Sequence, residues 1–391
     1  MKILHIIPTL SKGGAERLVL DIIKQTLKIE NTEVRLVIFR DEIAYDISEV
    51  NDIISIIPAS VQLSITKKLK INIAVLQSYI NEFNPDIIHT HLFEAELVSR
   101  FCFYPKARWF SHAHDNMVQF KNWVSLSKTK ITNWYEKQIL FKRYKKNQGT
   151  HFIAISKHAE SYMKKVQSDY KVTLLHNAIN VDRFIKPIEN IRKSKQIGFD
   201  STENVSSNYR LENDSKKLLK PSINIINIGS FVLKKNQNLL LDIISELVKR
   251  NIEVRCFFLG DGPLKIEVEK RAQELGISTH CIFLGNVNNV EEYLWQSHVY
   301  VHTATYEPLG LVLIEAMAAG LPVVSLDGGG NRDLIIDGVN GYLLIQQDPI
   351  EFADRILEVF QNKEISEFNY TFAKKYDIES YCTKLIEIYK T

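Results

Sequence analysis

Short, continuous apolar runs alternate with longer segments of helical periodicity along almost the whole chain, and this alternation constrains the fold more than any other feature. The runs are rich in Ile, Val and Leu, which is typical of parallel strands covered by helices on both faces. The expected strands are 2–8, 33–39, 86–91, 108–112, 152–156 and 172–176 in the first half, and 223–228, 254–259, 281–284, 299–302, 322–325 and 341–344 in the second.

A polar stretch, residues 185–221, separates the two series of expected strands. It is rich in Asn, Ser, Lys and Glu, which predicts a linker or a surface excursion. The length of 391 residues also exceeds the roughly 250–300 residues at which a single hydrophobic core stops growing. We therefore predict an α/β fold with two doubly wound, Rossmann-like parallel-sheet domains facing one another across a cleft that would hold the active site.

The bulk composition argues against several classes of protein. A net charge of +3 is too balanced for a chain that binds nucleic acid over its whole surface. The four cysteines form no Cys-x-x-Cys pair, which indicates core residues in a reducing compartment. No run reaches the roughly 18 apolar residues of a membrane span, and the N-terminal run is too short for a signal peptide. We expect a cytoplasmic protein. The sequence leaves open whether it also contacts the inner face of the plasma membrane.

Residues 311–319 are predicted to form a helix that is apolar on every face except for one carboxylate, Glu315. A helix that is apolar all round is a buried helix, and a buried carboxylate is costly unless hydrogen-bond donors reach it. Because no cation lies nearby in the sequence, we expect Glu315 to face a cleft that receives a ligand rich in hydroxyl groups. The alternative is a core helix whose one Glu points to solvent.

A second carboxylate, Glu307, lies on the loop that leads into this helix. The helix N-terminus at Gly310, Leu311 and Val312 would offer free N–H groups and a partial positive charge, which suit a phosphate. The segment would therefore place a phosphate-binding helix N-terminus between two carboxylates that can bind hydroxyl groups. A sugar nucleotide needs such an arrangement, because its phosphates lie between two groups that carry hydroxyls.

The spacing from Glu307 to Glu315, with the Ala-Met-Ala-Ala-Gly and Pro-Val-Val that follow, resembles the E-x7-E signature of retaining glycosyltransferases of family four, which have the GT-B fold. In that family the first Glu contacts the donor sugar and the second binds the ribose. The resemblance implies a nucleotide-diphosphate sugar as donor, most commonly a UDP-sugar, with no cofactor and no metal ion. It assigns donor binding to residues 222–375, and the acceptor side to residues 1–184 with the final helix, 376–391.

Two glycines, Gly13 and Gly14, follow the first expected strand and open the first helix. Glycine lets the backbone approach a ligand closely, and the helix N-terminus again suits a phosphate. An ordinary turn between a strand and a helix is the alternative. The Gly-Gly-Ala-Glu sequence is similar to the family-four loop that faces the donor and the acceptor.

Lys235 lies near the first helix of the second domain, where its ammonium group could neutralise a diphosphate and stabilise the leaving nucleotide. The alternative is an ordinary solvated lysine. The family usually has Gly-Arg-Leu where this chain has Gly229, Ser230 and Phe231, so an expected arginine is replaced by Ser230. Lys234 is a candidate to compensate for that missing charge.

His114 follows an expected strand and is similar to a family histidine that lies near the donor sugar. A histidine there can bind a sugar hydroxyl or move a proton, and Asp115 could orient its ring. The neighbouring His112 raises the question of a metal, but no third ligand at a suitable spacing is evident. We therefore expect no metal site.

The sequence Gly260-Asp261-Gly262 follows a strand and is only faintly like a dinucleotide-binding motif. Lys265 occupies the place of the third glycine, so a nicotinamide cofactor is rejected and a tight turn is favoured. Gly285 and Asn286 follow the next strand, and the similar family segment offers its backbone to the nucleotide base.

The stretch Lys121–Lys146 is basic and rich in aromatic residues. It predicts either contact with an anionic membrane surface or a solvated helix whose aromatic side chains pack on the first domain. Binding to RNA is disfavoured, because no other part of the chain supports it.

The function we predict is a metal-independent, retaining transfer of a sugar from a nucleotide-diphosphate sugar to a hydroxyl of a saccharide or lipid-linked acceptor, in surface polysaccharide biosynthesis. Glu307, His114 and Lys235 are the expected catalytic residues. The alternatives are another GT-B enzyme, such as a sugar-nucleotide epimerase, and a non-catalytic sugar-nucleotide-binding partner subunit, which the replacement at Ser230 favours.

Overall fold

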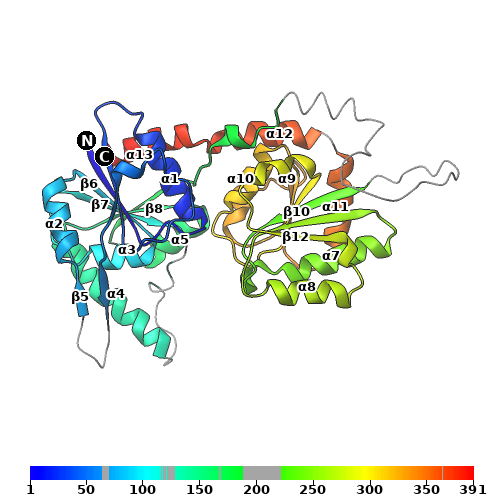
Figure 1. Cartoon of the computed structure of the whole chain (residues 1–391), viewed down its shortest axis with the longest axis horizontal. Helices are drawn as coiled ribbons and strands as arrows, with labels where there is room; N and C mark the ends of the chain where they lie inside the picture. The colour runs from blue at the N-terminus through cyan, green and yellow to red at the C-terminus, as the bar shows by residue number, and fades with distance from the viewer. Residues whose placement is uncertain are drawn as a thin grey trace.

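The computed structural model describes residues 1–63, 70–115, 117, 120, 128–166, 169–187, 222–362 and 364–391. Two domains lie side by side, each with a parallel sheet between helices (Figure 1). The predicted fold class is thereby confirmed. Of the expected linker 185–221, residues 188–221 lie outside the described part of the chain. No described helix is long and apolar enough to span a membrane.

The first sheet has parallel strands in the order β3-β2-β1-β6-β7-β8-β9. Its longer strands match the predicted apolar runs to within two residues at each end. They are β1 (Lys2–Ile7), β2 (Glu33–Ile38), β6 (Ile87–His91), β7 (Arg108–Ala113), β8 (His151–Ala154) and β9 (Lys171–Leu174). The short strand β3 (Ile54–Ile56) and the hairpin of β4 (Ser60–Gln62) and β5 (Lys70–Asn72) were not predicted, because segments this short carry no readable pattern.

The second sheet is also fully parallel, in the order β12-β11-β10-β13-β14-β15. Its strands are β10 (Ile223–Ile228), β11 (Val254–Leu259), β12 (Cys281–Gly285), β13 (Val299–His302), β14 (Val323–Leu326) and β15 (Gly341–Leu344). This is the doubly wound strand order, in which the chain reverses direction beside the first strand. The carboxyl ends of β1 and β10 are therefore the places where each domain is expected to meet a ligand.

Helices cover both sheets. In the first domain they are α1 (Gly14–Thr26), α2 (Ala74–Phe83), α3 (Leu92–Ser99), α4 (Lys128–Lys146) and α5 (Lys157–Val166). In the second they are α7 (Gln237–Lys249), α8 (Lys265–Glu274), α9 (Val290–Gln296), α10 (Leu311–Ala318), α11 (Pro349–Gln361) and α12 (Glu364–Ala373).

The last helix, α13 (Ile378–Lys390), leaves the second domain and packs on the first (Figure 1, red). Its buried residues Tyr381, Leu385 and Tyr389 share a core with Leu18 and Ile22 of α1. The chain therefore crosses between the domains twice, and this second crossing ties its C-terminal end to the first sheet.

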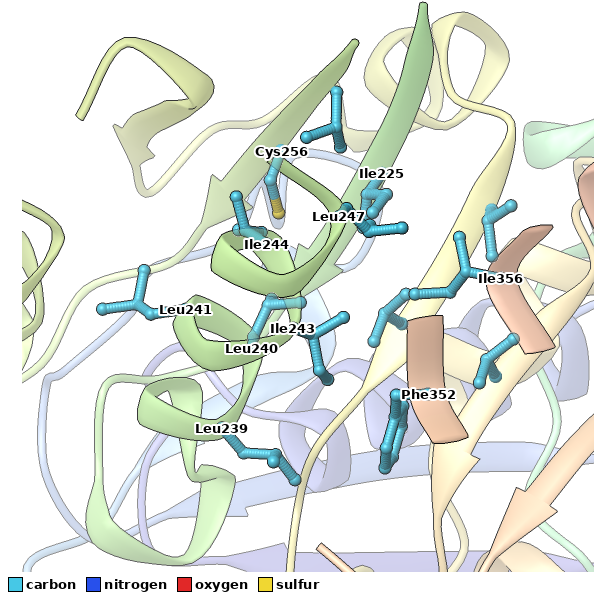
Figure 2. Packing of buried hydrophobic residues seen from close by; sticks show 14 of the residues in the cluster. Ile225, Leu239, Leu240, Leu241, Ile243, Ile244, Leu247, Cys256, Phe352 and Ile356 are labelled. Carbon is cyan, nitrogen blue, oxygen red and sulfur yellow. The ribbon is translucent and has the colours of Figure 1, made fainter. Parts of the chain in front are cut away.

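The second domain has its own core, in which α7 and α11 pack side by side on one face of the sheet (Figure 2). Helix α7 buries a run of leucines and isoleucines against Ile225 of β10 and Cys256 of β11, and Phe352 of α11 closes the layer. Complete burial of a side chain of this size contributes roughly 1.5–3 kcal/mol. This rigid layer supports the loops at the carboxyl ends of the strands.

Helix α4 contains the described part of the basic stretch Lys121–Lys146; residues 121–127 of it lie outside the described residues. Tyr144 is buried in the first domain and Phe141 packs beside it. The Arg143 guanidinium lies 4.1 Å from the centre of the Phe101 ring. These aromatic residues pack on the protein, as the solvated-helix alternative predicted, whereas Trp134 is 47% exposed.

Candidate functional site

A cavity of about 550 Å³ opens between the domains at the carboxyl ends of β1 and β10. Both domains contribute to its wall, mainly through the loops after β1, β2 and β12 and the helices α1 and α10. The lining residues are Lys12, Gly13, Gly14, Arg17, Leu20, Asp21, Lys24, Ala44, Tyr45, Asp46, Ala178, Ile179, Arg183, Phe184, Ile228, Asn286, Val287, Asn288, Val290, Leu311, Val312 and Glu315. Most of these residues are polar or small.

Glu315 lies on the second turn of α10, with its carboxylate on the cavity wall. Burial raises the pKa of this carboxyl to about 7, and the nearby cations Arg17 and Arg183 only partly oppose that effect. Among the described residues, no hydrogen bond engages the Glu315 side chain. The cavity wall therefore contains a carboxylate whose burial is energetically unfavourable and to which no described residue donates a hydrogen bond.

The N-terminus of α10 faces the same cavity through Leu311 and Val312. Gly310, which caps the helix, has φ of 95°, and no side chain caps the first turn. Among the described residues, the backbone N–H groups of Leu311 and Val312 have no hydrogen-bond partner. A helix start with open amides and an open cavity in front of it can bind an anion.

Glu307 is 7% exposed and lies just outside this cavity wall. Its Oε2 accepts hydrogen bonds from Lys235 Nζ at 2.6 Å and from His302 Nε2 at 3.0 Å. Although burial opposes ionisation, Lys235 and His302 together lower the pKa of Glu307 to about 2. Both contacts use one oxygen, so Oε1 remains without a partner among the described residues.

The backbone of Glu307 is held by the glycine turn that follows β14. The Glu307 N–H donates to the Gly328 carbonyl at 2.8 Å, and the Gly330 N–H donates to the Glu307 carbonyl at 2.9 Å. A Cβ atom at Gly330 would lie 1.7 Å from the Pro308 carbonyl oxygen, so only glycine allows the two strands of backbone to approach this closely. Asn331 Oδ1 accepts the Gly328 N–H and fixes the turn.

In the first domain, the Tyr45 hydroxyl is hydrogen-bonded to the backbone of the glycine loop. It accepts the Gly13 N–H at 3.0 Å and donates to the Gly13 carbonyl at 2.8 Å. A Cβ atom on Gly14 would be 3.4 Å from Leu311 Cδ1 of α10, so the glycine loop of the first domain lies next to the α10 N-terminus of the second.

Ser230, at the position where the family that the sequence resembles usually has an arginine, is exposed and lies outside the cavity wall. Lys234 is likewise absent from the cavity wall, and its Nζ lies 5.9 Å from the centre of the Tyr306 ring. The cavity's cations come from the first domain instead, and include Arg17 and Arg183. These pair with Asp21 and Glu291, at 3.3 and 2.8 Å respectively.

His114 is 9% exposed and follows β7 at the same edge of the sheet. The Asp115 carboxylate accepts the Met117 N–H at 2.7 Å, and among the described residues no hydrogen bond joins it to His114. The His114 ring contacts His91, whose Nδ1 lies 3.2 Å from His114 Nε2.

The predicted residues divide into two groups. Gly13, Gly14, Asn286, Leu311, Val312 and Glu315 line the cavity, whereas Ser230, Lys235, Gly285, Glu307, Gly310 and His114 do not. Gly285 has φ of 66°, and its carbonyl accepts the Gly260 N–H at 2.7 Å. The tight turn predicted at Gly260-Asp261-Gly262 is present. A Cβ atom on Gly260 would lie 2.2 Å from the Gly229 carbonyl oxygen, so the backbone there packs too closely for a side chain.

Sequence reasoning missed several site residues. Arg17, Tyr45, Arg183 and His302 belong to the cavity or to the Glu307 network. A signal was available for His302, because it is the last residue of a predicted strand and therefore lies at the ligand-binding edge. No comparable signal marks Arg183.

Two family models match most of the chain. Residues 12–183 match the model described as Glycosyltransferase Family 4, and residues 210–375 match that described as Glycosyl transferases group 1. The Vi polysaccharide biosynthesis protein VipC/TviE of Salmonella typhi is 30% identical over 139 residues, which are 34% of this chain and 24% of that protein. N-acetyl-alpha-D-glucosaminyl L-malate synthase of Bacillus anthracis is 28% identical over 207 residues, 51% and 52% of the two chains. The matches thus span about half or less of these curated relatives.

Solved structures share the whole architecture. HepE of Anabaena in complex with UDP has a TM-score of 0.75 at 20% identity and covers 99% of both chains. Sucrose-phosphate synthase from Thermosynechococcus elongatus has a TM-score of 0.74 at 17% identity and covers 100% of this chain and 98% of the other. Identity at this level shows the fold alone. The fold, the two family models and the curated relatives together establish that the chain belongs to the family-four type of glycosyltransferases with the GT-B fold.

Proposed function

We propose that this glycosyltransferase moves a sugar from a nucleotide-diphosphate sugar, a UDP-sugar in the first instance, to a hydroxyl of a saccharide or lipid-linked acceptor, with retention at the anomeric carbon and without a metal ion. The observation that carries the proposal is the open start of α10, with Glu315 on its cavity side and Glu307 on the loop before it. Glu315 would accept the ribose hydroxyls and the amides of Leu311 and Val312 would bind a phosphate.

In the reaction, the bond from the sugar C1 to the diphosphate oxygen breaks and a bond from C1 to the acceptor oxygen forms. The acceptor proton leaves with the nucleotide diphosphate. Lys235 would stabilise the charge that develops on the diphosphate, and the α10 amides would do the same from the helix end. Glu307 stays ionised because its pKa is about 2, so its open Oε1 can bind a sugar hydroxyl.

The donor and the pathway rest on similar proteins. A structure of the Anabaena protein HepE contains UDP-glucose, and a relative from Salmonella typhi takes part in Vi polysaccharide biosynthesis. These names support a UDP-sugar donor and a role in surface or capsular polysaccharide assembly.

The proposal is tested by following thermal unfolding of the full chain with UDP, GDP and their glucose conjugates, and then by analysing products with a saccharide acceptor. A ligand that binds only the folded state at 100 times its Kd adds about 2.7 kcal/mol of stability. Stabilisation by a nucleotide sugar together with a new glycosidic product supports transfer. Tight binding with no product from any donor would favour the non-catalytic binder, and an epimerised nucleotide sugar would favour the epimerase.

We also propose that α4 touches an anionic membrane surface, because Lys142, Lys145 and Lys146 are exposed on it. Since each lysine near such a surface contributes about 1 kcal/mol, replacing all three by Gln should weaken binding to phosphatidylserine vesicles by roughly 100-fold at low salt. Vesicle co-sedimentation measures the change, which should shrink as salt rises.

The matched control for this experiment replaces three exposed lysines elsewhere, Lys249, Lys270 and Lys384. It removes the same charge but should leave vesicle binding close to that of the unchanged protein. Equal losses in both variants would mean that only net charge matters, and no loss in either would remove the membrane contact.

A further inference from the structure

A row of histidines lies on one face of the first sheet. His5 is on β1, His89 and His91 are on β6, and His112 is on β7. Residues two apart on a strand point to the same face, and His114 continues this alternation just after β7. The first four are fully buried, His89 contacts Tyr389 of α13, and His114 keeps 9% exposure.

Three of these rings form a continuous hydrogen-bonded chain. His5 Nδ1 lies 2.9 Å from His91 Nε2, and His91 Nδ1 lies 3.2 Å from His114 Nε2. Burial lowers the pKa of His5 to about 3 and the pKa values of His91 and His114 well below the usual range. Each ring is therefore neutral near pH 7 and carries one N–H group.

A chain of neutral imidazoles can order its protons in two directions. In one, Nδ1–H of His5 donates to His91, and Nδ1–H of His91 donates to His114. In the other, every bond is reversed and the His5 proton moves to Nε2. That nitrogen is buried and has no partner among the described residues. An orphaned buried N–H is rarer than a bare acceptor, so the first direction is favoured.

We propose that His5 and His91 hold His114 in the tautomer that carries its proton on Nδ1, so that His114 presents a hydrogen-bond donor, and not a general base, at the carboxyl end of β7. His114 Nδ1 has no partner among the described residues, which leaves it available to a ligand. The inference rests on the proposed function, because the acceptor of this hydrogen bond would be an oxygen of the donor sugar. His5 and His91 are then positioning residues, which act only through His114.

A metal ion is the competing explanation for such a cluster. One ring nitrogen from each of His5, His89 and His91 lies within 4.8 Å of the others, and the same holds for His91, His112 and His114, where His91 is the third ligand that the sequence spacing did not reveal. However, tetrahedral zinc with bonds of 2.0–2.1 Å separates its ligand nitrogens by about 3.3 Å, more than the 2.9 Å between the His5 and His91 nitrogens and the 3.2 Å between the His91 and His114 nitrogens. The described cluster also contains only histidines, so no carboxylate would balance a buried dication.

Nuclear magnetic resonance of the full chain with ¹⁵N-labelled histidine tests the proposal without any assay of activity. We expect His114, assigned from the signals lost in His114→Asn, to carry its proton on Nδ1. His91→Asn should preserve that tautomer, because the amide can still donate to His114 Nε2. His91→Leu should leave His114 as a mixture of its two neutral tautomers, because leucine donates no hydrogen bond. His151→Asn, on the neighbouring strand β8 and outside the chain, is the matched control.

Kinetics of the same variants add a second readout. His91→Leu should lower kcat about tenfold or more, and His91→Asn should recover most of that loss, whereas the His151 control should be unchanged. A proton on Nε2 of His114 in the unchanged protein, equal loss in the Asn and Leu variants, or stoichiometric zinc in the purified chain would each overturn the proposal. The tautomer of His114 is measured by nuclear magnetic resonance and not by activity. A chain that made no product would therefore contradict the proposed transfer but not this inference.

Discussion

Replacing Glu307 by Gln should lower the rate of sugar transfer about 100- to 1,000-fold, the range seen when one preorganised electrostatic contact is lost from an active site. The carboxylate is ionised, oriented by Lys235 and His302, and keeps one oxygen open. Gln fills the same space but carries no charge. Binding of UDP alone should change little, because Glu307 lies outside the cavity wall that would hold the nucleotide. Initial rates and UDP titrations measure the two effects separately.

The same substitution should also destabilise the fold, so the two effects must be separated. Lys235 and Glu307 are both mostly buried, and removal of one partner from a buried ion pair costs about 3–5 kcal/mol. The double variant Lys235→Met with Glu307→Gln removes both charges and should recover much of that stability in urea unfolding. Transfer should stay low in the double variant. If activity returned together with stability, Glu307 would be a structural residue and its catalytic role would be wrong.

The regular elements could be predicted because they depend on local patterns. Continuous apolar runs marked every strand of the two sheets except β3, whose length of three residues carries no period. The placement of α13 on the first domain followed from the family resemblance alone, since nothing in its own sequence says which sheet it covers. The hairpin of β4 and β5 was missed for the same reason as β3.

The site was predictable only in its local parts. Glu315 and the α10 N-terminus belong to one short segment, so their joint exposure to a cavity could be expected from burial and helix chemistry. The contact between Lys235 and Glu307 joins residues 72 apart, and that between His5 and His91 joins residues 86 apart. Such pairs depend on strand order and on which loops meet. The spacing of two between His89 and His91 did carry a signal, because it places both on one face of a strand.

Replacing Glu315 by Gln should weaken UDP binding about 10- to 100-fold, which corresponds to the loss of a hydrogen bond to a charged group. It should also stabilise the ligand-free protein. The folded-state pKa of Glu315 is raised from 4.5 to about 7, so the folded chain keeps a proton that the unfolded chain releases. Stability contributed by this group is complete below pH 4.5, falls as pH rises through the window to about 7, and is then constant. Above pH 7 the variant should gain roughly 1–3 kcal/mol.

The opposite signs of these two effects make Glu315 a sharp test of the site. Urea unfolding at pH 5 and pH 8 measures the stability difference, and calorimetric titration with UDP measures affinity. Glu291→Gln is the matched control: it removes a carboxylate of the same length that is already paired with Arg183 at 2.8 Å, so it should lower stability. A protein that tolerates an unpartnered carboxylate in its cleft loses stability until a ligand supplies the donors. Unchanged affinity combined with unchanged stability in Glu315→Gln would show that this carboxylate meets solvent and binds no ribose.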